Sequence, residues 1–407
     1  MGYTTQAIKG ISWVGLLRGT TRIVSFAKIA ILARILTPAQ FGVYGIAALA
    51  LSFLDVLTET GVNVILIQEK DDIDRHISSA WIVSIARGIL MSGVILVMAP
   101  FVAGFFQSPD SLFLLQLISI VPLLRGFINP SVVKFQRDLQ FKKEFLYRSV
   151  LFVIDAGTAV AVAFATHQAA SIVVGLIVGV VVEAVLSFVV AKPRPTLRFE
   201  NEYIAKIFHR GKWVTLSGVF QYLFQNVDNI VVGKLLGTGS LGLYQLGYSI
   251  SILPISEVAD VVSRVTFPVY TKIADDTDRL RKAFMRTVMI IACVTIPFGI
   301  ILFFFSEQLI TLVFGKQWVG VVPALRVLAI FGVIRAVFGF CATLFLAVGK
   351  QEYITVATLA SITAMGLVIV PFVNSFGLIG AAYAALVGSV FGSIVFSFFT
   401  IKVLYSK

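Results

Sequence analysis

The sequence has 407 residues, of which 58% are hydrophobic and 13% are charged, and its mean hydropathy is +0.95. A soluble domain typically has about 45–50% apolar and about 25% charged residues, so this composition excludes an ordinary soluble protein. The formal net charge of +12 does not indicate nucleic-acid binding, because the cations of a multi-pass membrane protein first follow the positive-inside rule. We therefore expect an all-α integral membrane protein with no nucleic-acid partner.

Apolar stretches long enough to cross a bilayer recur along the whole chain. The first ten residues lack the charged region, short apolar core and cleavage site of a removable signal peptide, so we expect the first stretch to be a retained helix. The pattern predicts twelve spans, at about residues 11–36, 41–67, 77–103, 111–132, 147–167, 170–191, 211–236, 240–270, 284–306, 320–348, 353–374 and 378–402.

Lys and Arg residues are concentrated in alternate loops. The loop after the fourth span carries Lys134, Arg137, Lys142 and Lys143, and the loops after the sixth and eighth spans are similarly basic. The loops between spans 3 and 4, 5 and 6, and 11 and 12 contain no cation. By the positive-inside rule, both termini and the basic loops are predicted to be cytoplasmic.

The two halves of the chain resemble each other. AILARILTPAQFGVYGIA, near residue 30, is followed 200 residues later by IVVGKLLGTGSLGLYQLG, so that Tyr44 aligns with Tyr244; Arg125 aligns with Arg335 at an offset of 210. Six spans per copy is an even number, so the repeats are predicted to be parallel. We expect an N-terminal lobe (1–191), a cytoplasmic linker with a basic amphipathic segment (192–210) and a C-terminal lobe (211–407).

The first span carries three cations, Arg18, Arg22 and Lys28. Each costs at least ~2.5–3.5 kcal/mol at bilayer depth, so such residues usually face a water-filled cavity or a partner. At about 100° per residue, they fall with Thr21 and Ser25 within an arc of about 120°. This polar stripe predicts the wall of a passage for an anionic substrate.

The second span carries two acids, Asp55 and Glu59, at the same depths as Arg22 and Arg18. Adjacent spans could therefore pair these charges. The pairs are either purely structural, hiding charge from lipid, or they balance the arginines and exchange with a substrate phosphate or a coupling ion.

The seventh span, which repeats the first, has its own polar stripe: Gln221, Gln225 and Asp228, with Asn229 beside them. Their spacing places them on one helix face. Amides suit sugar hydroxyls because they offer both donors and acceptors; polar contact between helices is the alternative explanation. Arg125 and Arg335, within spans 4 and 10, are further candidates for substrate binding, because the planar fork of arginine suits a pyrophosphate.

No catalytic arrangement stands out. The sequence contains no Gly-rich phosphate loop followed by Lys and Ser/Thr, no nucleophile–His–acid pattern and no metal-ligand spacing. We therefore expect a transporter without a cofactor, rather than an enzyme, driven by H⁺ or Na⁺, by the membrane potential or by consumption of the product.

Five segments resemble the Wzx-type polysaccharide flippases of the MOP superfamily, near the colanic-acid and teichuronic-acid branch: LTPAQFGVYGIA, KFQRDLQFKKEF, DNIVVGKLLGTGSLGLYQLGYSI, FPVYTKIADDTDRLRKAF and FGKQWVGVVPALRVLAIFG. The resemblance implies two six-helix bundles around a V-shaped central cavity, as in MATE-like proteins. It also implies export of undecaprenyl pyrophosphate-linked oligosaccharide to the outer leaflet of a bacterial inner membrane by alternating access.

Such a flippase would serve the synthesis of lipopolysaccharide O-antigen, capsule or exopolysaccharide, with membrane lipid, a polysaccharide polymerase and glycosyltransferases as partners. One alternative is a cation-coupled drug or metabolite exporter of the MATE branch, although its cavity would be expected to be acidic where this first span is basic. A membrane polysaccharide polymerase is a third hypothesis; the short external loops and the duplication argue against it.

Overall fold

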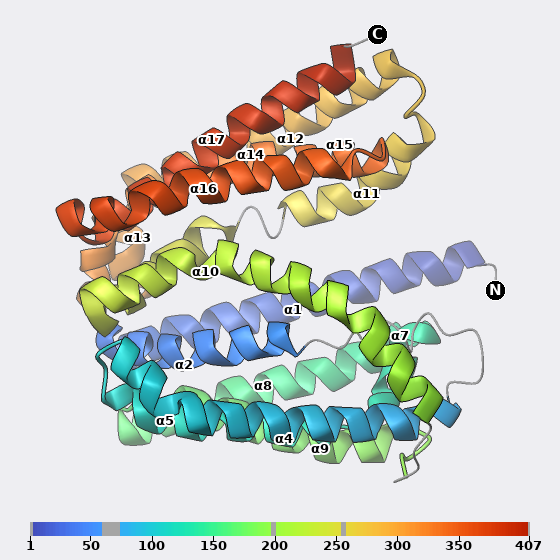
Figure 1. The fold of residues 1–407 in the computed structure, drawn as a ribbon, viewed down its shortest axis with the longest axis vertical. Helices are drawn as coiled ribbons and strands as arrows, with labels where there is room; N and C mark the ends of the chain where they lie inside the picture. The colour runs from blue at the N-terminus through green and yellow to red at the C-terminus, as the bar shows by residue number, and fades with distance from the viewer. Residues whose placement is uncertain (1–2, 59–73, 197–200, 254–257, 406–407) are drawn as a thin grey trace. The chain divides into compact units, whose positions relative to one another are not determined.

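A computed structural model describes residues 3–58, 74–196, 201–253 and 258–405, which form helices and no strand. The helices of the first half are α1 (Tyr3–Ile35), α2 (Pro38–Leu57), α4 (Asp74–Phe105), α5 (Asp110–Ile118), α6 (Ile120–Gly126), η1 (Pro130–Val133), α7 (Lys134–Arg137), α8 (Phe141–Thr166) and α9 (Ala170–Val190) (Figure 1). They are followed by α10 (Asn201–Ser251), α11 (Asp260–Lys272), α12 (Thr277–Phe304), α13 (Ser306–Val313), η3 (Lys316–Val321), α14 (Val322–Gly339), α15 (Cys341–Ala347), α16 (Gln351–Phe376) and α17 (Leu378–Tyr405).

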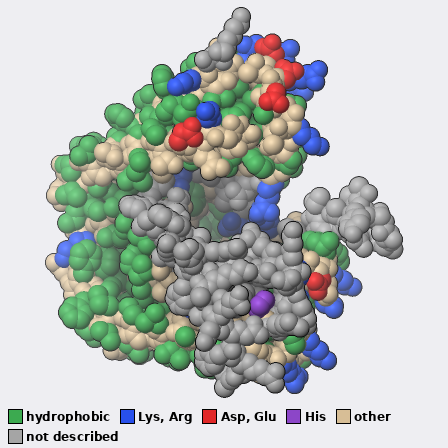
Figure 2. All heavy atoms as spheres, turned by 45° about the vertical axis from the view of Figure 1, so that its right-hand side comes forward, with side chains coloured by type: hydrophobic (Ala, Val, Ile, Leu, Met, Phe, Trp, Pro, Cys, Tyr) green, Lys and Arg blue, Asp and Glu red, His purple; other side chains and the backbone are tan. Residues whose placement is uncertain are grey.

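The chain is a multi-pass membrane protein. Eight helical segments within the described residues are long and apolar enough to cross a bilayer, and a ninth span results if the pair Asp110–Gly126 and Pro130–Arg137, bent by 74°, is counted. Helix α1 is not among the eight, and it carries the cations of the predicted stripe. Apolar side chains cover broad areas of the surface in Figure 2, as expected where helices face lipid rather than water.

Several predicted spans are not single straight helices. The predicted span 111–132 is divided into α5, α6 and η1, with Pro130 at the first position of η1. Within the predicted span 240–270, α10 ends at Ser251 and α11 begins at Asp260. In the predicted linker, the described backbone from Asn201 forms the first turns of α10, which continues into the predicted seventh span.

Two compact units divide the described chain, Met1–Asn226 and Val227–Lys407. In the first unit, α1 packs along α8, α8 along α9 and α4 along α6. The first part of α10 belongs to this unit, where the Tyr222 hydroxyl donates to the carbonyl of Leu49 in α2 at 2.7 Å. In the second unit, α17 packs along both α16 and α14.

Turns in the two halves of the chain recur at nearly constant sequence separation. Residues with positive φ occur at Gln107, Leu139 and His167, and again at Gly315, Gly349 and Gly377, which are 208, 210 and 210 residues later. The hydrogen bonds around them match as well: the amide of Gln140 donates to Phe135 O, and that of Lys350 donates to Phe345 O, both at 2.8 Å. A left-handed residue ends a helix at each of these places, so helix termini recur at the same positions of the two halves.

Candidate functional site

Lys28, the deepest cation of the α1 stripe, forms an ion pair with Asp155 of α8. The ammonium nitrogen lies 2.8 Å from both carboxylate oxygens, and the two side chains are only 13% and 18% exposed. The pair explains how this charge is tolerated inside an apolar helix pair, because a buried cation is stabilised by a matched partner.

Two glycines of α9 make room for Asp155. A Cβ placed on Gly175 would lie 2.7 Å from the Asp155 carbonyl oxygen and 2.9 Å from Oδ1, and one on Gly179 would lie 3.1 Å from the Asp155 Cβ. Small residues allow membrane helices to approach closely. The α8–α9 contact therefore fixes the carboxylate that receives Lys28.

Arg18 and Arg22 occupy a different environment on α1. Arg18 is partly buried and Arg22 is exposed. Thr21, between them, donates from its hydroxyl to the carbonyls of Leu17 and Arg18 at 2.9 and 3.0 Å, so it is satisfied within its own helix. Of the three cations of the stripe, Arg22 is therefore the exposed one.

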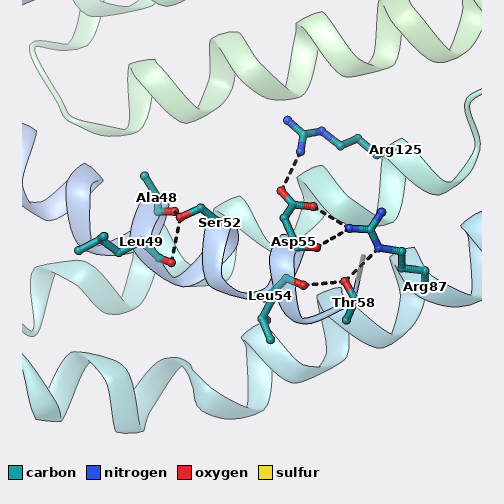
Figure 3. A network of polar contacts seen from close by, with 8 residues as sticks. All are labelled: Ala48, Leu49, Ser52, Leu54, Asp55, Thr58, Arg87 and Arg125. Atoms are coloured by element: carbon teal, nitrogen blue, oxygen red, sulfur yellow. Dashed lines mark hydrogen bonds and ion pairs between the residues drawn. The ribbon is translucent and has the colours of Figure 1, made fainter. Parts of the chain in front are cut away.

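Asp55 lies between two arginines, which approach it from α4 and α6 (Figure 3). Its Oδ1 is 3.2 Å from Nη2 of Arg87, and its Oδ2 is 3.2 Å from Nη1 of Arg125. Arg87 also donates to the Asp55 carbonyl and to Thr58 Oγ1, both at 2.9 Å. Thr58 caps the C-terminus of α2 and donates in turn to Leu54 O.

The sequence placed Asp55 level with Arg22, but the structure gives it Arg87 and Arg125 as partners. Depth along a helix fixes the level of a residue but not its direction around the axis, and α2 packs against α4 and α5. Glu59, the expected partner of Arg18, lies outside the described residues.

Close packing of α4 against α6 holds the two arginines side by side. A Cβ on Gly88 would lie 2.5 Å from Pro122 O, and one on Gly126 would lie 2.9 Å from Ser84 O. Each glycine directly follows one of the arginines in sequence. The backbones therefore approach at the residues next to Arg87 and Arg125, which both reach the same carboxylate.

In the second unit, Asp228 and Asn229 are buried, at 3% and 6% exposure. Asp228 Oδ1 accepts from the backbone and side-chain nitrogens of Asn229 at 2.8 and 3.2 Å, and its Oδ2 accepts from the Tyr244 hydroxyl at 2.9 Å. Gln225, one turn earlier, is exposed, and the side chain of Gln221 lies outside the described part. The residues of this stripe therefore occupy unlike environments.

Arg335, which aligns with Arg125 at an offset of 210 residues, is held by aromatic residues. Its Nη1 donates to the Tyr248 hydroxyl at 2.6 Å, and its guanidinium carbon lies 5.6 Å from the centre of the Phe331 ring. The rings of Tyr244 and Tyr248 are 6.1 Å apart, so tyrosines separate this arginine from Asp228. Sequence reasoning did not assign the tyrosines a role, although the alignment of Tyr44 with Tyr244 was a signal for one of them.

These groups can bind anions and form hydrogen bonds to polyols. Among the described residues, no group of three or more His, Cys, Asp and Glu side chains is placed to hold a metal ion. Five arginines of the two units carry a planar fork that can donate paired hydrogen bonds to phosphate oxygens: Arg18, Arg22, Arg87 and Arg125 in the first unit and Arg335 in the second.

A model of the family described as "Polysaccharide biosynthesis protein" matches residues 31–323, which is more than half of the chain. The chain belongs to this family. The match runs from the end of α1 through η3 and so includes the Asp55 network and the buried Asp228. The sequence-based resemblance to polysaccharide flippases is confirmed at the level of the family.

Two relatives of this polysaccharide biosynthesis protein match most of its length. The teichuronic acid biosynthesis protein TuaB of Bacillus subtilis (strain 168) is 25% identical over 86% of this chain and 73% of its own. The lipopolysaccharide biosynthesis protein WzxC of Escherichia coli (strain K12) is 24% identical over 83% of this chain and 69% of its own. Among solved structures, the lipid II flippase MurJ in an inward closed conformation superposes with a TM-score of 0.77 at 16% identity, covering 97% of this chain and 89% of MurJ. The chain therefore has the same fold as MurJ.

Proposed function

We propose that this protein is a flippase that moves undecaprenyl pyrophosphate-linked oligosaccharide from the cytoplasmic to the outer leaflet of a bacterial inner membrane by alternating access. The product would serve O-antigen, capsule or exopolysaccharide synthesis. In this proposal the chain is a transporter and not an enzyme.

One observation carries the proposal: this member of a polysaccharide biosynthesis family has arginines within the helices α1, α4 and α6 of one unit, and those of α4 and α6 converge on Asp55. A cation inside a bilayer is costly and usually serves a substrate or ion pathway. The substrates of polysaccharide export have a sugar part and a pyrophosphate, and guanidinium groups bind phosphate oxygens in pairs. Binding the pyrophosphate of such a headgroup would account for the arginines in these helices.

We propose twelve spans in two parallel repeats of six, with both termini in the cytoplasm. The recurrence of positive-φ turns at separations of 208 to 210 residues supports the duplication. The concentration of Lys and Arg in alternate loops supports the orientation. In this arrangement the lobes are residues 1–191 and 211–407, joined through 192–210.

The proposed substrate contacts fall into two groups with different chemistry. The pyrophosphate would bind to guanidinium groups, and the sugars to amides and carboxylate oxygens. Asp55 and Glu59 would balance the cations or respond to a coupling ion, H⁺ or Na⁺. The proposed substrate-binding residues are Arg18, Arg22, Lys28, Arg125, Arg335, Gln221, Gln225, Asp228 and Asn229.

The proposal is tested in cells that lack their own copy of the transporter. The double variant Arg18→Ala/Arg22→Ala should insert in the membrane at the wild-type level and yield no surface polysaccharide. Normal surface polysaccharide from that variant would refute the role of the α1 stripe. If the protein instead raised resistance to cationic dyes without restoring polysaccharide, the MATE-like exporter would replace the flippase.

A further inference from the structure

We propose that the turn between α7 and α8, together with the exposed face of α8 that follows it, is a binding site for an anionic phospholipid of the surrounding membrane. Lys142 and Lys143 hold the phosphate of the lipid headgroup, and apolar side chains of α8 contact the acyl chains. The site does not depend on what the protein transports.

The turn and the first residues of α8 carry an excess of cations. Residues 134–148 contain five Lys and Arg and two acids. Lys142 and Lys143 are exposed, and among the described residues neither takes part in an ion pair. Both lie in the first turn of α8, a segment long and apolar enough to cross a bilayer, and therefore where a span meets the lipid headgroups. Two ammonium groups are thus available to a phosphate.

The buried acid of this region is occupied by contacts within the turn. Glu144 is 6% exposed and accepts hydrogen bonds from Nε2 of Gln136 at 2.6 Å and from Nε of Arg148 at 2.9 Å. The ring of Phe135 packs edge-on against that of Tyr147, with the ring centres 6.0 Å apart. These contacts join α7 to α8 and use the carboxylate of Glu144, so the two exposed lysines are left to bind an external anion.

An apolar face of α8 continues from Lys142 into the membrane. Leu146, Val150 and Val153 are half-exposed. At 3.6 residues per turn they lie with Lys142 within an arc of about 80°. Asp155, which contacts α1 and α9, lies on the opposite side of the helix. The exposed face thus has a cation at its end and apolar side chains deeper in the span, in the same order as the headgroup and acyl chains of an anionic phospholipid.

The second half of the chain repeats this turn without its excess of charge. Helix α16 begins and ends 210 residues after α8, and Gly349 repeats the left-handed conformation of Leu139. The equivalent stretch, residues 344–358, contains one cation and one acid, and these form an ion pair: Lys350 Nζ lies 4.0 Å from Glu352 Oε1. Glu352 stands where the first turn has a lysine. The two turns therefore offer a comparison of charge within one molecule.

The surroundings of α8 favour a lipid over an acidic protein as the occupant. Only 11% of the residues in its apolar stretch are buried, against 28% to 50% in the other seven segments that can cross a bilayer. Lysine suits a phosphate because its ammonium group is a compact charge with three donors. A lysine near an anionic lipid surface strengthens the attraction about fivefold, so two should favour an anionic over a zwitterionic lipid by about 25-fold.

The test measures which lipid is enriched beside the turn in the full chain, reconstituted in phosphatidylcholine nanodiscs. In a background without Cys293 and Cys341, a fluorophore is attached at Leu139→Cys, or at Gln351→Cys in the equivalent turn of the second half. Quenching is measured with phosphatidylglycerol or phosphatidylcholine that carries a nitroxide on one acyl chain, at equal mole fractions. Both leaflets of the nanodisc have the same composition, so the result does not depend on the orientation of the protein.

At Leu139, phosphatidylglycerol should bind about 25-fold more strongly than phosphatidylcholine, and at Gln351 the two should bind equally. The double variant Lys142→Gln/Lys143→Gln should remove the preference at Leu139, whereas Lys142→Arg/Lys143→Arg should retain it. Lys350→Gln is the matched control, because it removes a cation from the equivalent turn, and it should leave the preference at Leu139 unchanged.

Equal quenching by the two lipids at Leu139 would overturn the lipid site and leave an acidic protein as the occupant of this basic surface. A preference for phosphatidylglycerol that persists in Lys142→Gln/Lys143→Gln would overturn the assignment to these lysines. If that variant does not fold, the wild type in about 1 M NaCl decides, because salt screens exposed charges. The preference should then fall several-fold, and an unchanged preference would refute the electrostatic site.

Discussion

The ion pair between Lys28 and Asp155 offers a quantitative test of why a cation is tolerated within α1. We expect Asp155→Asn and Lys28→Met to destabilise the protein individually, and the double variant Lys28→Met/Asp155→Asn to recover most of the loss. The reason is that each single substitution leaves one uncompensated charge between α1 and α8, whereas the double substitution removes both.

The size of the effect follows from the geometry. At 2.8 Å and an effective dielectric of about 20, the attraction between two unit charges is ~6 kcal/mol, and desolvation of both groups offsets much of it. Breaking a buried pair from one side typically costs about 3–5 kcal/mol. The Lys28 and Asp155 side chains are only 13% and 18% exposed, so the cost of breaking this pair should be close to that of a fully buried one. Each single variant should therefore lose about 3–5 kcal/mol, and the double variant much less.

The purified variants are heated in detergent, and unfolding is measured as the loss of the monodisperse fraction on gel filtration. Glu352→Gln is the control for an exposed pair, since Glu352 and its partner Lys350 are 59% and 51% exposed. Equal stability of Lys28→Met and the wild type would refute the structural role of the pair. If that variant also lost transport, Lys28 would act on the substrate directly.

Three further predictions follow from particular contacts. Gly88→Val should lower the free energy of unfolding by about 1–3 kcal/mol and abolish export, because the new side chain would push α4 away from the Pro122 carbonyl. Gly93→Val lies on the same helix with open space around it and should have neither effect. Equal effects of the two variants in melting and export assays would contradict the close approach of α4 to α6. Tyr244→Phe removes the hydroxyl that donates a hydrogen bond to Asp228, and should lower the free energy of unfolding by about 1.5–3 kcal/mol. The exposed Tyr383→Phe is the control and should leave the melting temperature unchanged. In a background without Cys293 and Cys341, His167→Cys should react with an impermeant thiol reagent added outside and Lys142→Cys should not; the reverse pattern would invert the topology.

Much of the fold could be predicted from the sequence, because apolar length and charge distribution are local signals. Helices lie over all of the predicted spans within the described residues, and α8, α9, α16 and α17 end close to the predicted limits. The break between α5 and α6 was less accessible, because it depends on packing against neighbouring helices rather than on hydropathy.

The residues of the site could be predicted better than their pairing. Arg125, Asp55 and Lys28 stand out as charges within apolar helices, and all three form ion pairs. Their partners are 32 to 127 residues away along the chain, and a helical wheel does not say which neighbour a face meets. The glycines next to Arg87 and Arg125 indicate that each of these helices is closely approached there, since they permit the α4–α6 contact. The sequence does not say which helix makes that approach.

The central claim is that the protein moves a lipid-linked pyrophosphate glycan across the bilayer, and reconstituted transport tests it most directly. Purified protein in liposomes would be loaded with undecaprenyl pyrophosphate-linked oligosaccharide, and a membrane-impermeant glycosidase would report the fraction of glycan exposed outside. We predict that the wild type exposes glycan from the inner leaflet with time, and that Arg18→Ala/Arg22→Ala leaves about half protected, as in protein-free liposomes with lipid in both leaflets. Exposure by the double variant at the wild-type rate would contradict the account, as would a wild-type protein that leaves the inner glycan protected.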